Sequence, residues 1–209
     1  MATTQAMARL TRDEFIERVE ALLHHGNAPL ALALTDLDNF SSINDTFGRE
    51  AGDATLRAWE RVLGSNLPSD AVVARLGGDE YAVALPGQSA ENALILCEEM
   101  REHFASHHVE GVGANQAIDA SIGIAAHPAH SAGAADLMQA AGEALMRAKR
   151  EGRGRSAIYV EEKMVLKTTY YRRAALDRLS RLATATGRTE AMLLREALDN
   201  LLDSYSAET

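Results

Sequence analysis

Two adjacent carboxylates directly follow two adjacent glycines in the segment 75–81, Arg-Leu-Gly-Gly-Asp-Glu-Tyr. Apolar residues flank this segment on both sides, and such a pattern predicts a β-hairpin that turns at Gly77 and Gly78. Glycine adopts positive φ readily and has no Cβ, so a ligand can approach the turn closely. Asp79 and Glu80 then lie at the tip of the hairpin, where carboxylate oxygens can hold a hard cation such as Mg²⁺. On these residues alone, an ordinary solvated turn is the alternative.

A third carboxylate, Asp36, directly follows the apolar run 29–35. A continuous apolar run of this length is typical of a strand that is covered on both faces. If this strand neighbours the hairpin, the carboxylates of Asp36, Asp79 and Glu80 converge at one edge of the sheet. Their mutual repulsion then needs a divalent cation to offset it.

Two further pairs of polar residues can bind a nucleotide. Asn44 supplies an amide and Asp53 a carboxylate, and together they can read a base edge; a carboxylate that accepts from the amino and imino N–H groups selects guanine over adenine. Helix capping is the alternative for both residues. Lys149 and Arg153 lie four positions apart at the end of a predicted helix, where they can grip phosphates or merely complement the helix C-terminus.

The elements that must position these residues alternate between helices and strands around one antiparallel hairpin. This order predicts an α/β fold, with a mixed sheet flanked by helices. The predicted helices are 11–23, 54–63, 89–104 and 134–150, the predicted strands are 29–35, 117–126 and 156–160, and the hairpin spans 71–85.

Charge is distributed unevenly along the chain, whose formal net charge is −9. Residues 1–160 carry 13 basic and 22 acidic side chains, whereas residues 161–209 carry eight of each. Seven basic residues lie between positions 163 and 188, against Asp177 alone. This asymmetry indicates two modules, the second facing a polyanion, although a solvated helix face is the simpler alternative.

Composition also bears on the compartment. The single Cys97 excludes an internal disulfide and fits a reducing cytoplasm, and its apolar helical surroundings predict a buried, inert thiol. No apolar run approaches the length of a membrane span and no signal peptide is evident, so we expect a cytoplasmic protein without a membrane partner.

The motifs in segments 36–53, 75–81, 121–125 and 144–153 follow one another over about 150 residues and closely resemble those of the GGDEF domain of diguanylate cyclases. The resemblance implies a nucleotidyl-cyclase-like GGDEF fold over residues 1–160. It also implies that two such domains face each other, each with one GTP, and that they condense these to cyclic di-GMP and release pyrophosphate.

The same resemblance implies roles for individual residues. Asp36, Asp79 and the backbone carbonyl of Leu37 would bind Mg²⁺ (or Mn²⁺), while Asn44 and Asp53 would hold guanine. Phosphate contacts are implied for Gly77, Gly78, Lys149 and Arg153. Asp79 and Glu80 would be the catalytic residues, with Glu80 completing the metal and acid–base surroundings.

Two departures from the family pattern are relevant. Ser41 stands where the family usually has a phosphate-contacting lysine, which implies a lower rate or a domain that binds GTP without turnover. The stretch 67–70, Leu-Pro-Ser-Asp, lacks the arginine of the family's inhibitory product site, so feedback by cyclic di-GMP at that position is not expected.

The tail 161–209 is predicted to contain a strand over 164–171, a helix over 172–186 that ends at Gly187, and a second helix capped by Thr189. One strand and two helices in about 45 residues cannot bury a core alone, so two copies must pair. A homodimerisation hairpin is the simplest interpretation.

This β-α-α tail also resembles the ribbon-helix-helix DNA-binding family, through the segment 167–198. In that family two strands pair across a dimer and lie in the major groove of double-stranded DNA. Apolar alternation would direct Lys167 and Thr169 toward the bases, whereas the spacing to the first helix favours the register one residue later. Arg188 and Thr189 would hold a phosphate, and residues 163–190 would form the DNA-contacting region.

Taken together, these patterns predict a cytoplasmic, homodimeric bacterial diguanylate cyclase joined to a ribbon-helix-helix module. Two alternatives stay open at this point. The chain can be a nucleotide-responsive DNA-binding regulator, in transcription or segregation, with a weak or inactive cyclase domain. The tail can also serve only to dimerise the enzyme.

Overall fold

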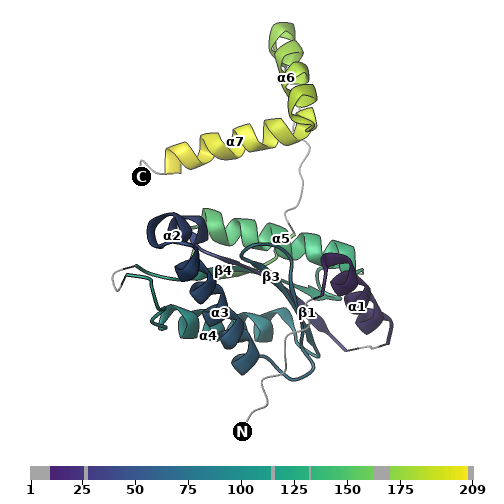
Figure 1. Cartoon of the computed structure of the whole chain (residues 1–209). Coiled ribbons are helices and arrows are strands. Elements are labelled where there is room, and N and C mark those ends of the chain that lie inside the picture. The colour runs from purple at the N-terminus through teal and green to yellow at the C-terminus, as the bar shows by residue number, and fades with distance from the viewer. Residues whose placement is uncertain (1–9, 26–27, 114–115, 132, 162–169, 207–209) are drawn as a thin grey trace. The chain divides into compact units, whose positions relative to one another are not determined.

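A five-stranded sheet with strand order β2-β3-β1-β4-β5 organises the first of the chain's two units, residues 1–162 (Figure 1). The computed structural model describes residues 10–25, 28–113, 116–131, 133–161 and 170–206. The strands are β1 (Leu30–Leu37), β2 (Val72–Arg75), β3 (Glu80–Pro86), β4 (Ala120–His127) and β5 (Ser156–Ile158).

The central strand β1 is antiparallel to both of its neighbours, β3 and β4, while β5 runs parallel to β4. Strands β2 and β3 form the predicted hairpin, with the Gly-Gly segment between them. In this register Asp36 lies opposite Glu80 on one side and Ser121 on the other. The end of β1 therefore meets the start of β3, which brings the two predicted groups of carboxylates to the same edge of the sheet.

Helices cover both faces of the sheet (Figure 1). Helices α3 (Arg49–Asn66) and α4 (Ala90–Ala105) pack on one face, and α1 (Arg12–His25) and α5 (Ala134–Arg150) pack on the other. A short helix, α2 (Phe40–Phe47), leads from the end of β1 into α3. The predicted mixed α/β sheet with flanking helices is confirmed.

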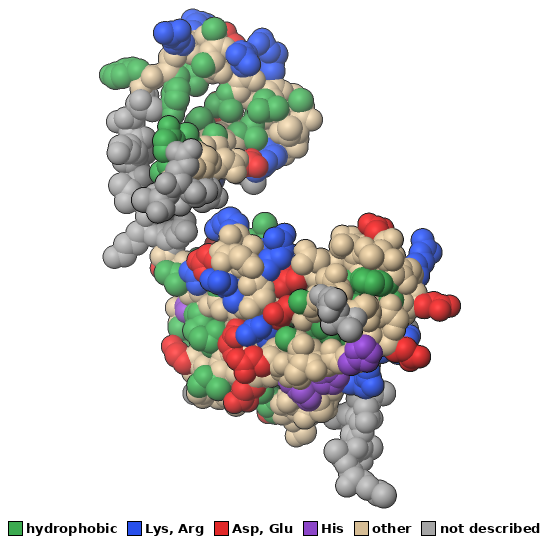
Figure 2. Space-filling view, turned by 90° about the vertical axis from the view of Figure 1, so that its left-hand side faces the viewer, with side chains coloured by type: hydrophobic (Ala, Val, Ile, Leu, Met, Phe, Trp, Pro, Cys, Tyr) green, Lys and Arg blue, Asp and Glu red, His purple; other side chains and the backbone are tan. Residues whose placement is uncertain are grey.

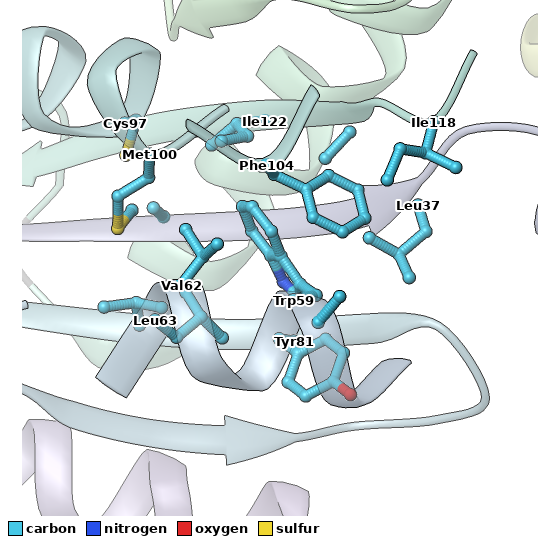
Figure 3. Packing of buried hydrophobic residues seen from close by; sticks show 14 of the residues in the cluster. Leu37, Trp59, Val62, Leu63, Tyr81, Cys97, Met100, Phe104, Ile118 and Ile122 are labelled. Carbon is cyan, nitrogen blue, oxygen red and sulfur yellow. The ribbon is translucent and has the colours of Figure 1, made fainter. Parts of the chain in front are cut away.

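Trp59 of α3 is the centre of the core on the α3/α4 face (Figure 3). Its indole N–H donates to the Thr35 hydroxyl at 3.2 Å, and its ring meets Phe104 edge to face with 5.0 Å between the ring centroids. Cys97 lies in the same core, where burial raises the pKa of its thiol to about 12. The thiol is therefore protonated and buried, as predicted.

The opposite face is rich in alanine, and α5 approaches β4 closely at Gly123. A Cβ on Gly123 would lie 2.1 Å from both the Ala141 carbonyl oxygen and the Leu145 amide nitrogen of α5. Because these are backbone atoms, only glycine fits between the helix and the strand at this position.

The free edge of β5 is closed by side chains. The amide N–H of Ser156 donates to the carboxylate of Glu98 on α4, and the guanidinium of Arg147 on α5 donates to the Ile158 carbonyl. Two backbone groups on the open side of β5, the Ser156 amide and the Ile158 carbonyl, are thus bonded to side chains of the same unit.

Several predicted boundaries differ from the observed ones. The helix 134–150 is confirmed in full, and Ser89 caps α4 by accepting from the amide of Asn92. The helix predicted over 54–63 extends over 49–66, because Gly48, at φ 86°, separates α2 from a first turn of α3 that is mostly polar. Strand β4 begins at Ala120 rather than at 117, since the Asp119 carboxylate binds the amide of Ala120.

The second unit, residues 163–209, contains helices α6 (Arg173–Thr186) and α7 (Glu190–Ser206). Gly187 ends α6 in the left-handed conformation, with φ 65°, as predicted. Most of the predicted strand 164–171, including Lys167 and Thr169, lies outside the described residues, and residues 170–172 are not in a strand.

Apolar side chains are exposed along both helices of the second unit (Figure 2). Among the residues that the structure describes in this unit, Ala183 is the one buried apolar residue. The large exposed apolar residues of α6 and α7 are Leu176, Leu182, Leu194, Leu198, Leu201, Leu202 and Tyr205. Across both units, none of the helices in the described part of the chain has the length and hydropathy needed to span a membrane.

Candidate active site

Asp36, at the end of β1, forms the best-defined charged contact of the site. Its carboxylate lies 2.8 Å from the ammonium nitrogen of Lys149, which comes from the last turn of α5. Both side chains are mostly buried. The structure thus joins the carboxylate predicted to bind metal with the lysine predicted to bind phosphate, and each neutralises the other.

Asp79 lies close enough to interact electrostatically with this pair. Partial burial raises the pKa of its carboxyl group, the negative charge of Asp36 raises it further, and the positive charge of Lys149 opposes the shift. Two nearby carboxylates therefore share one lysine, and a divalent cation between them would relieve their repulsion.

The carboxylates suit Mg²⁺ although they do not form a complete metal cage. In the described part of the chain, no three His, Cys, Asp or Glu side chains cluster as a metal site. Mg²⁺ characteristically takes one or two carboxylates and completes its octahedron with water and substrate phosphates. Asp36 and Asp79 supply two carboxylates of this kind, so the residues present suit a cation that takes its remaining ligands from water and a nucleotide.

Arg75 holds the Gly77–Gly78 segment from the preceding strand. Its guanidinium donates to the Gly78 carbonyl from two nitrogens, and Nε also reaches the Gly77 carbonyl at 3.4 Å. The loop amide of Leu76 donates to the Glu80 carbonyl at 2.9 Å and closes the turn. A Cβ on Gly78 would meet nothing within 4 Å, so the loop presents open backbone to a ligand.

Glu60 of α3 holds Arg75 and Tyr81, the two residues that flank the Gly77–Gly78 segment in the hairpin. It accepts a hydrogen bond from the hydroxyl of Tyr81 at 3.0 Å and pairs with Arg75 at 3.8 Å. Burial and the neighbouring carboxylate of Glu60 raise the pKa of Tyr81, so its hydroxyl remains a donor. Arg75 also lies 5.7 Å from the centre of the Tyr81 ring. Sequence reasoning missed the contribution of Glu60, which lies 21 residues from Tyr81 and carries no motif.

Asn44 lies beside the first turns of α3. A Cβ on Gly52 would be 2.0 Å from the Asn44 side-chain oxygen, so the glycine makes room for that amide next to the exposed Asp53. The capping alternative is wrong for both polar residues, because Asn44 lies within α2 and Asp53 lies more than a turn inside α3. Ser41 is exposed on α2.

Asp38 is a buried carboxylate that sequence reasoning left without a role. It accepts from the Ser121 hydroxyl at 2.8 Å and from the Gly154 amide at 2.9 Å, and it lies 3.9 Å from Nε of Arg153. Burial raises the pKa of Asp38 and the charges of Asp119 and Asp36 add to the rise, while the two hydrogen bonds oppose it. Its position two residues after Asp36, in the turn that follows β1, was the available signal.

In the second unit, Arg188 and Thr189 lie at the start of α7. The guanidinium of Arg188 pairs with Glu196 at 2.6 Å, and the carbonyl of Thr189 accepts from the amide of Leu193 at 3.2 Å. Arg188 is therefore neutralised within its own unit. Lys167 and Thr169 lie outside the described residues.

Comparison with known proteins adds a family-level result. Residues 2–155 match the family model described as "Diguanylate cyclase, GGDEF domain". The chain is 37% identical over 147 residues to diguanylate cyclase DgcP of Pseudomonas aeruginosa, a match that covers 70% of this chain and 22% of DgcP. It is 34% identical over 162 residues to probable diguanylate cyclase DgcE of Escherichia coli, covering 76% of this chain and 15% of DgcE. These matches thus span less than a quarter of either relative.

Solved structures give a corresponding likeness in three dimensions. The active GGEEF domain of a diguanylate cyclase from Vibrio cholerae superposes with a TM-score of 0.67 and 29% identity, covering 73% of this chain and 98% of that one. The GGDEF domain of DgcB from Caulobacter crescentus, in complex with c-di-GMP, superposes with a TM-score of 0.66 and 28% identity, covering 76% and 96%.

Proposed function

The chain belongs to the GGDEF domain family of diguanylate cyclases, and from this premise we propose that residues 1–160 condense two molecules of GTP to cyclic di-GMP and pyrophosphate. The observation that carries the proposal is the ion pair of Asp36 with Lys149, with which Asp79 of the open Gly-Gly segment interacts electrostatically. The single buried Cys97 is compatible with a reaction in the cytoplasm.

Mg²⁺ or Mn²⁺ would be held by Asp36, Asp79 and the Leu37 carbonyl. When bound, the cation supplies charge neutralisation at the phosphoryl oxygens and lowers the pKa of the attacking hydroxyl. Lys149, which pairs with Asp36, would exchange this partner for a phosphate oxygen of the substrate. The exchange conserves its charge pairing and frees Asp36.

The remaining residues orient the nucleotide. Asn44 and Asp53 would hold the guanine edge, and Arg75 keeps the Gly77–Gly78 loop open for the phosphates. In a pair of facing domains, the 3′-oxygen of one GTP bonds to the α-phosphorus of the other. The bond from that phosphorus to the bridging oxygen breaks, pyrophosphate leaves, and the hydroxyl proton passes to solvent near Glu80. A second, identical step closes the ring.

The test is direct detection of product. Full-length protein is incubated with GTP and Mg²⁺, and cyclic di-GMP is measured by liquid chromatography. Asp79→Ala is expected to abolish product while the fold, checked by circular dichroism, is retained. Gly52→Ala is a sharper probe of guanine binding, because its Cβ displaces the Asn44 side chain without meeting backbone; we expect a raised KM for GTP. Absence of product from well-folded wild type would contradict the proposal.

For the second unit we propose a ribbon-helix-helix module that forms a homodimer and binds double-stranded DNA. Its exposed leucines on α6 and α7 support pairing with a second copy, since that surface would otherwise remain in water. Seven basic residues between positions 163 and 188 support a polyanionic partner. A dimer would also hold two cyclase domains at high effective concentration.

DNA binding is tested by retardation of duplex DNA at increasing salt. Lys167→Ala and Arg188→Ala are expected to weaken binding and to reduce its salt dependence. Arg61→Ala is the matched control, since it removes one exposed arginine of α3 in the first unit. Unchanged retardation in both tail variants would leave dimerisation as the role of the module.

A second candidate function is a nucleotide-responsive DNA-binding regulator with a silent cyclase domain. Ser41, at the position of the family's usual lysine, favours it. The expected result under this candidate is a change in DNA affinity on adding GTP or cyclic di-GMP, without turnover. Restoring the basic residue with Ser41→Lys should then produce measurable cyclic di-GMP.

A further inference from the structure

Asp38 connects three elements that meet beside the proposed phosphate site. It lies in the turn that follows β1, accepts a hydrogen bond from Ser121 on β4, and accepts another from Gly154 in the turn that follows α5. We propose that Asp38 is a positioning residue that holds Arg153 toward the terminal phosphates of GTP. This inference depends on the proposed function, which assigns Arg153 to those phosphates.

The turn after α5 has a conformation that requires such an anchor. Gly152, Arg153 and Gly154 have φ values of 118°, 61° and 55°. A left-handed conformation costs a non-glycine residue about 1–2 kcal/mol, so Arg153 adopts it only because surrounding contacts impose it. Two hydrogen bonds from backbone amides do so: the Arg153 amide donates to the Ala148 carbonyl at 3.1 Å, and the Gly154 amide donates to the Asp38 carboxylate.

The turn after α5 also packs closely against Asp119. A Cβ on Gly154 would lie 2.8 Å from a carboxylate oxygen of Asp119. The turn is therefore confined between two acidic side chains, and Asp38 is the one that bonds its backbone. Its buried position, with 5% of the side chain exposed, fixes the carboxylate more firmly than a surface residue could be fixed.

The negative charge of Asp38 also orients the Arg153 side chain. The Asp38 oxygen that accepts from Ser121 lies 3.9 Å from Nε of Arg153, whose side chain is 54% exposed. Attraction at Nε orients the inner edge of the guanidinium and leaves its two terminal nitrogens available. These nitrogens form the pair of donors that binds a phosphate in bidentate geometry.

Two neighbouring carboxylates thus each lie beside one of the two predicted phosphate-binding cations, Lys149 and Arg153. Asp36 pairs with Lys149 at 2.8 Å, and Asp38 lies near Arg153 at 3.9 Å. Asp36 lies near the end of β1 and Asp38 in the turn that follows it, and both carboxylates face the end of α5, where Lys149 lies in the last turn and Arg153 just beyond it. In this arrangement Asp36 is released to metal, whereas Asp38 stays buried and continues to orient Arg153.

The experiment compares the affinities of full-length protein for GTP and GMP, measured by calorimetry with Mg²⁺. Asp38→Asn retains an oxygen for the Gly154 amide and removes the charge. We expect the Kd for GTP to rise about tenfold, as for the loss of one charge-assisted contact. The Kd for GMP, which lacks the terminal phosphates, should stay within about twofold. A purely structural role would weaken both nucleotides alike.

A double-mutant cycle tests whether Asp38 acts through Arg153. Once Arg153→Ala is present, adding Asp38→Asn should cause no further loss of GTP affinity. Ser121→Ala is the matched control, because it removes a hydrogen bond of Asp38 but keeps its charge, and it should leave the GTP-to-GMP ratio unchanged. The inference would be overturned if Asp38→Asn weakened the affinities for GTP and GMP equally. It would also be overturned if the double variant lost GTP affinity by the product of the two single-variant factors.

Two further outcomes keep this inference distinct from the proposed function. If Asp38→Asn does not fold, Arg153→Lys carries the test, because its ammonium lacks the Nε–H that faces Asp38. Arg153→Lys should lose nearly as much GTP affinity as Arg153→Ala. If its ratio of GTP to GMP affinity equals that of wild type, the proposal is contradicted. Wild type that binds GTP over GMP without forming cyclic di-GMP would reject the cyclase activity but leave the role of Asp38 measurable.

Discussion

The two units of the chain differ in where their apolar side chains lie. In the first unit, Trp59 is completely buried between the sheet and α4, whereas in the second unit Leu201 is 53% exposed and Tyr205 is 67% exposed. The first unit therefore has an internal source of stability, which the described helices of the second unit lack. A catalytic site needs fixed side chains, and the unit with the closed core is the one that carries the candidate site.

The same contrast holds for charged side chains. In the first unit, Lys149 pairs with the mostly buried Asp36 of β1, and Arg153 lies 3.9 Å from the buried Asp38 in the turn that follows β1. Arg188 of the second unit pairs with Glu196, and both of these side chains are exposed. Exposed pairs contribute little to stability and exchange readily, so Arg188 can be recruited by a partner at small cost.

The largest expected effect is in the core of the first unit. Trp59→Ala should lower the free energy of unfolding by about 3–5 kcal/mol, because it leaves a cavity and removes the donor to Thr35. Urea unfolding followed by circular dichroism measures this loss. Trp59→Phe serves as control and should cost less, since it retains most of the volume. A loss below about 1 kcal/mol for the alanine variant would contradict the picture of a closed core.

Gly123→Ala tests the close approach of α5 to β4. Its methyl group must displace helix backbone, and we expect a loss of about 1–3 kcal/mol in the free energy of unfolding. Gly64→Ala is the matched control, because a Cβ there meets nothing within 4 Å and the residue lies in α3. The control should be neutral or stabilising by up to about 1 kcal/mol. Equal effects in the two variants would argue against direct helix–strand contact.

Glu98→Gln removes the negative charge beside β5 while keeping the size of the side chain, so it tests how much that charge contributes to stability. Partial burial acts to raise the pKa of Glu98, but hydrogen bonds from Arg101 and Ser156 outweigh it and lower the pKa below its ordinary value. Stability from this ionised group is present above the unfolded-state pKa and is lost as pH falls through the folded one. We expect the variant to lose about 1 kcal/mol at neutral pH.

The pH series decides whether that loss is electrostatic. Thermal unfolding of wild type and Glu98→Gln should converge as the pH falls below the lowered pKa of Glu98. A difference that stays constant down to acid pH would mean that packing, rather than ionisation, accounts for the change.

The smallest effect on unfolding is expected in the second unit. Leu201→Asp should change the unfolding free energy of the first unit by less than about 0.5 kcal/mol, because the residue is already exposed. If a second copy covers α6 and α7, the same change should convert dimer to monomer in analytical ultracentrifugation. A substitution at an exposed polar site of the same helix, Asn200→Asp, is the control and should leave the mass unchanged. A monomeric wild type would remove the proposed pairing.

Much of the first unit could be predicted from local pattern. Helix α5 has a clear apolar period, Ser89 is a typical cap, and the glycine pair marks the hairpin, so each of these was confirmed. Helix α2 was not among the predicted helices and α3 was predicted only in part, because the break at Gly48 depends on a positive φ rather than on apolar spacing. Local rules therefore identified the elements better than their ends.

The contacts within the candidate site were less accessible from the sequence. The pairing of Lys149 with Asp36 depends on how α5 lies along β1, and the bond from Gly154 to Asp38 joins residues 116 positions apart. No local pattern encodes such distances. The motif resemblance named Asp36, Asp79 and Lys149, while Asp38 and Glu60 emerged only from packing.

The closed edge at β5 bears on how the protein behaves when it is concentrated. An exposed edge strand presents unpaired amides and carbonyls to neighbouring molecules and can promote aggregation by strand addition. Here the Ser156 amide is taken by Glu98 and the Ile158 carbonyl by Arg147, so this border cannot extend into another molecule's sheet without first breaking both contacts. These two contacts therefore disfavour aggregation by strand addition at β5.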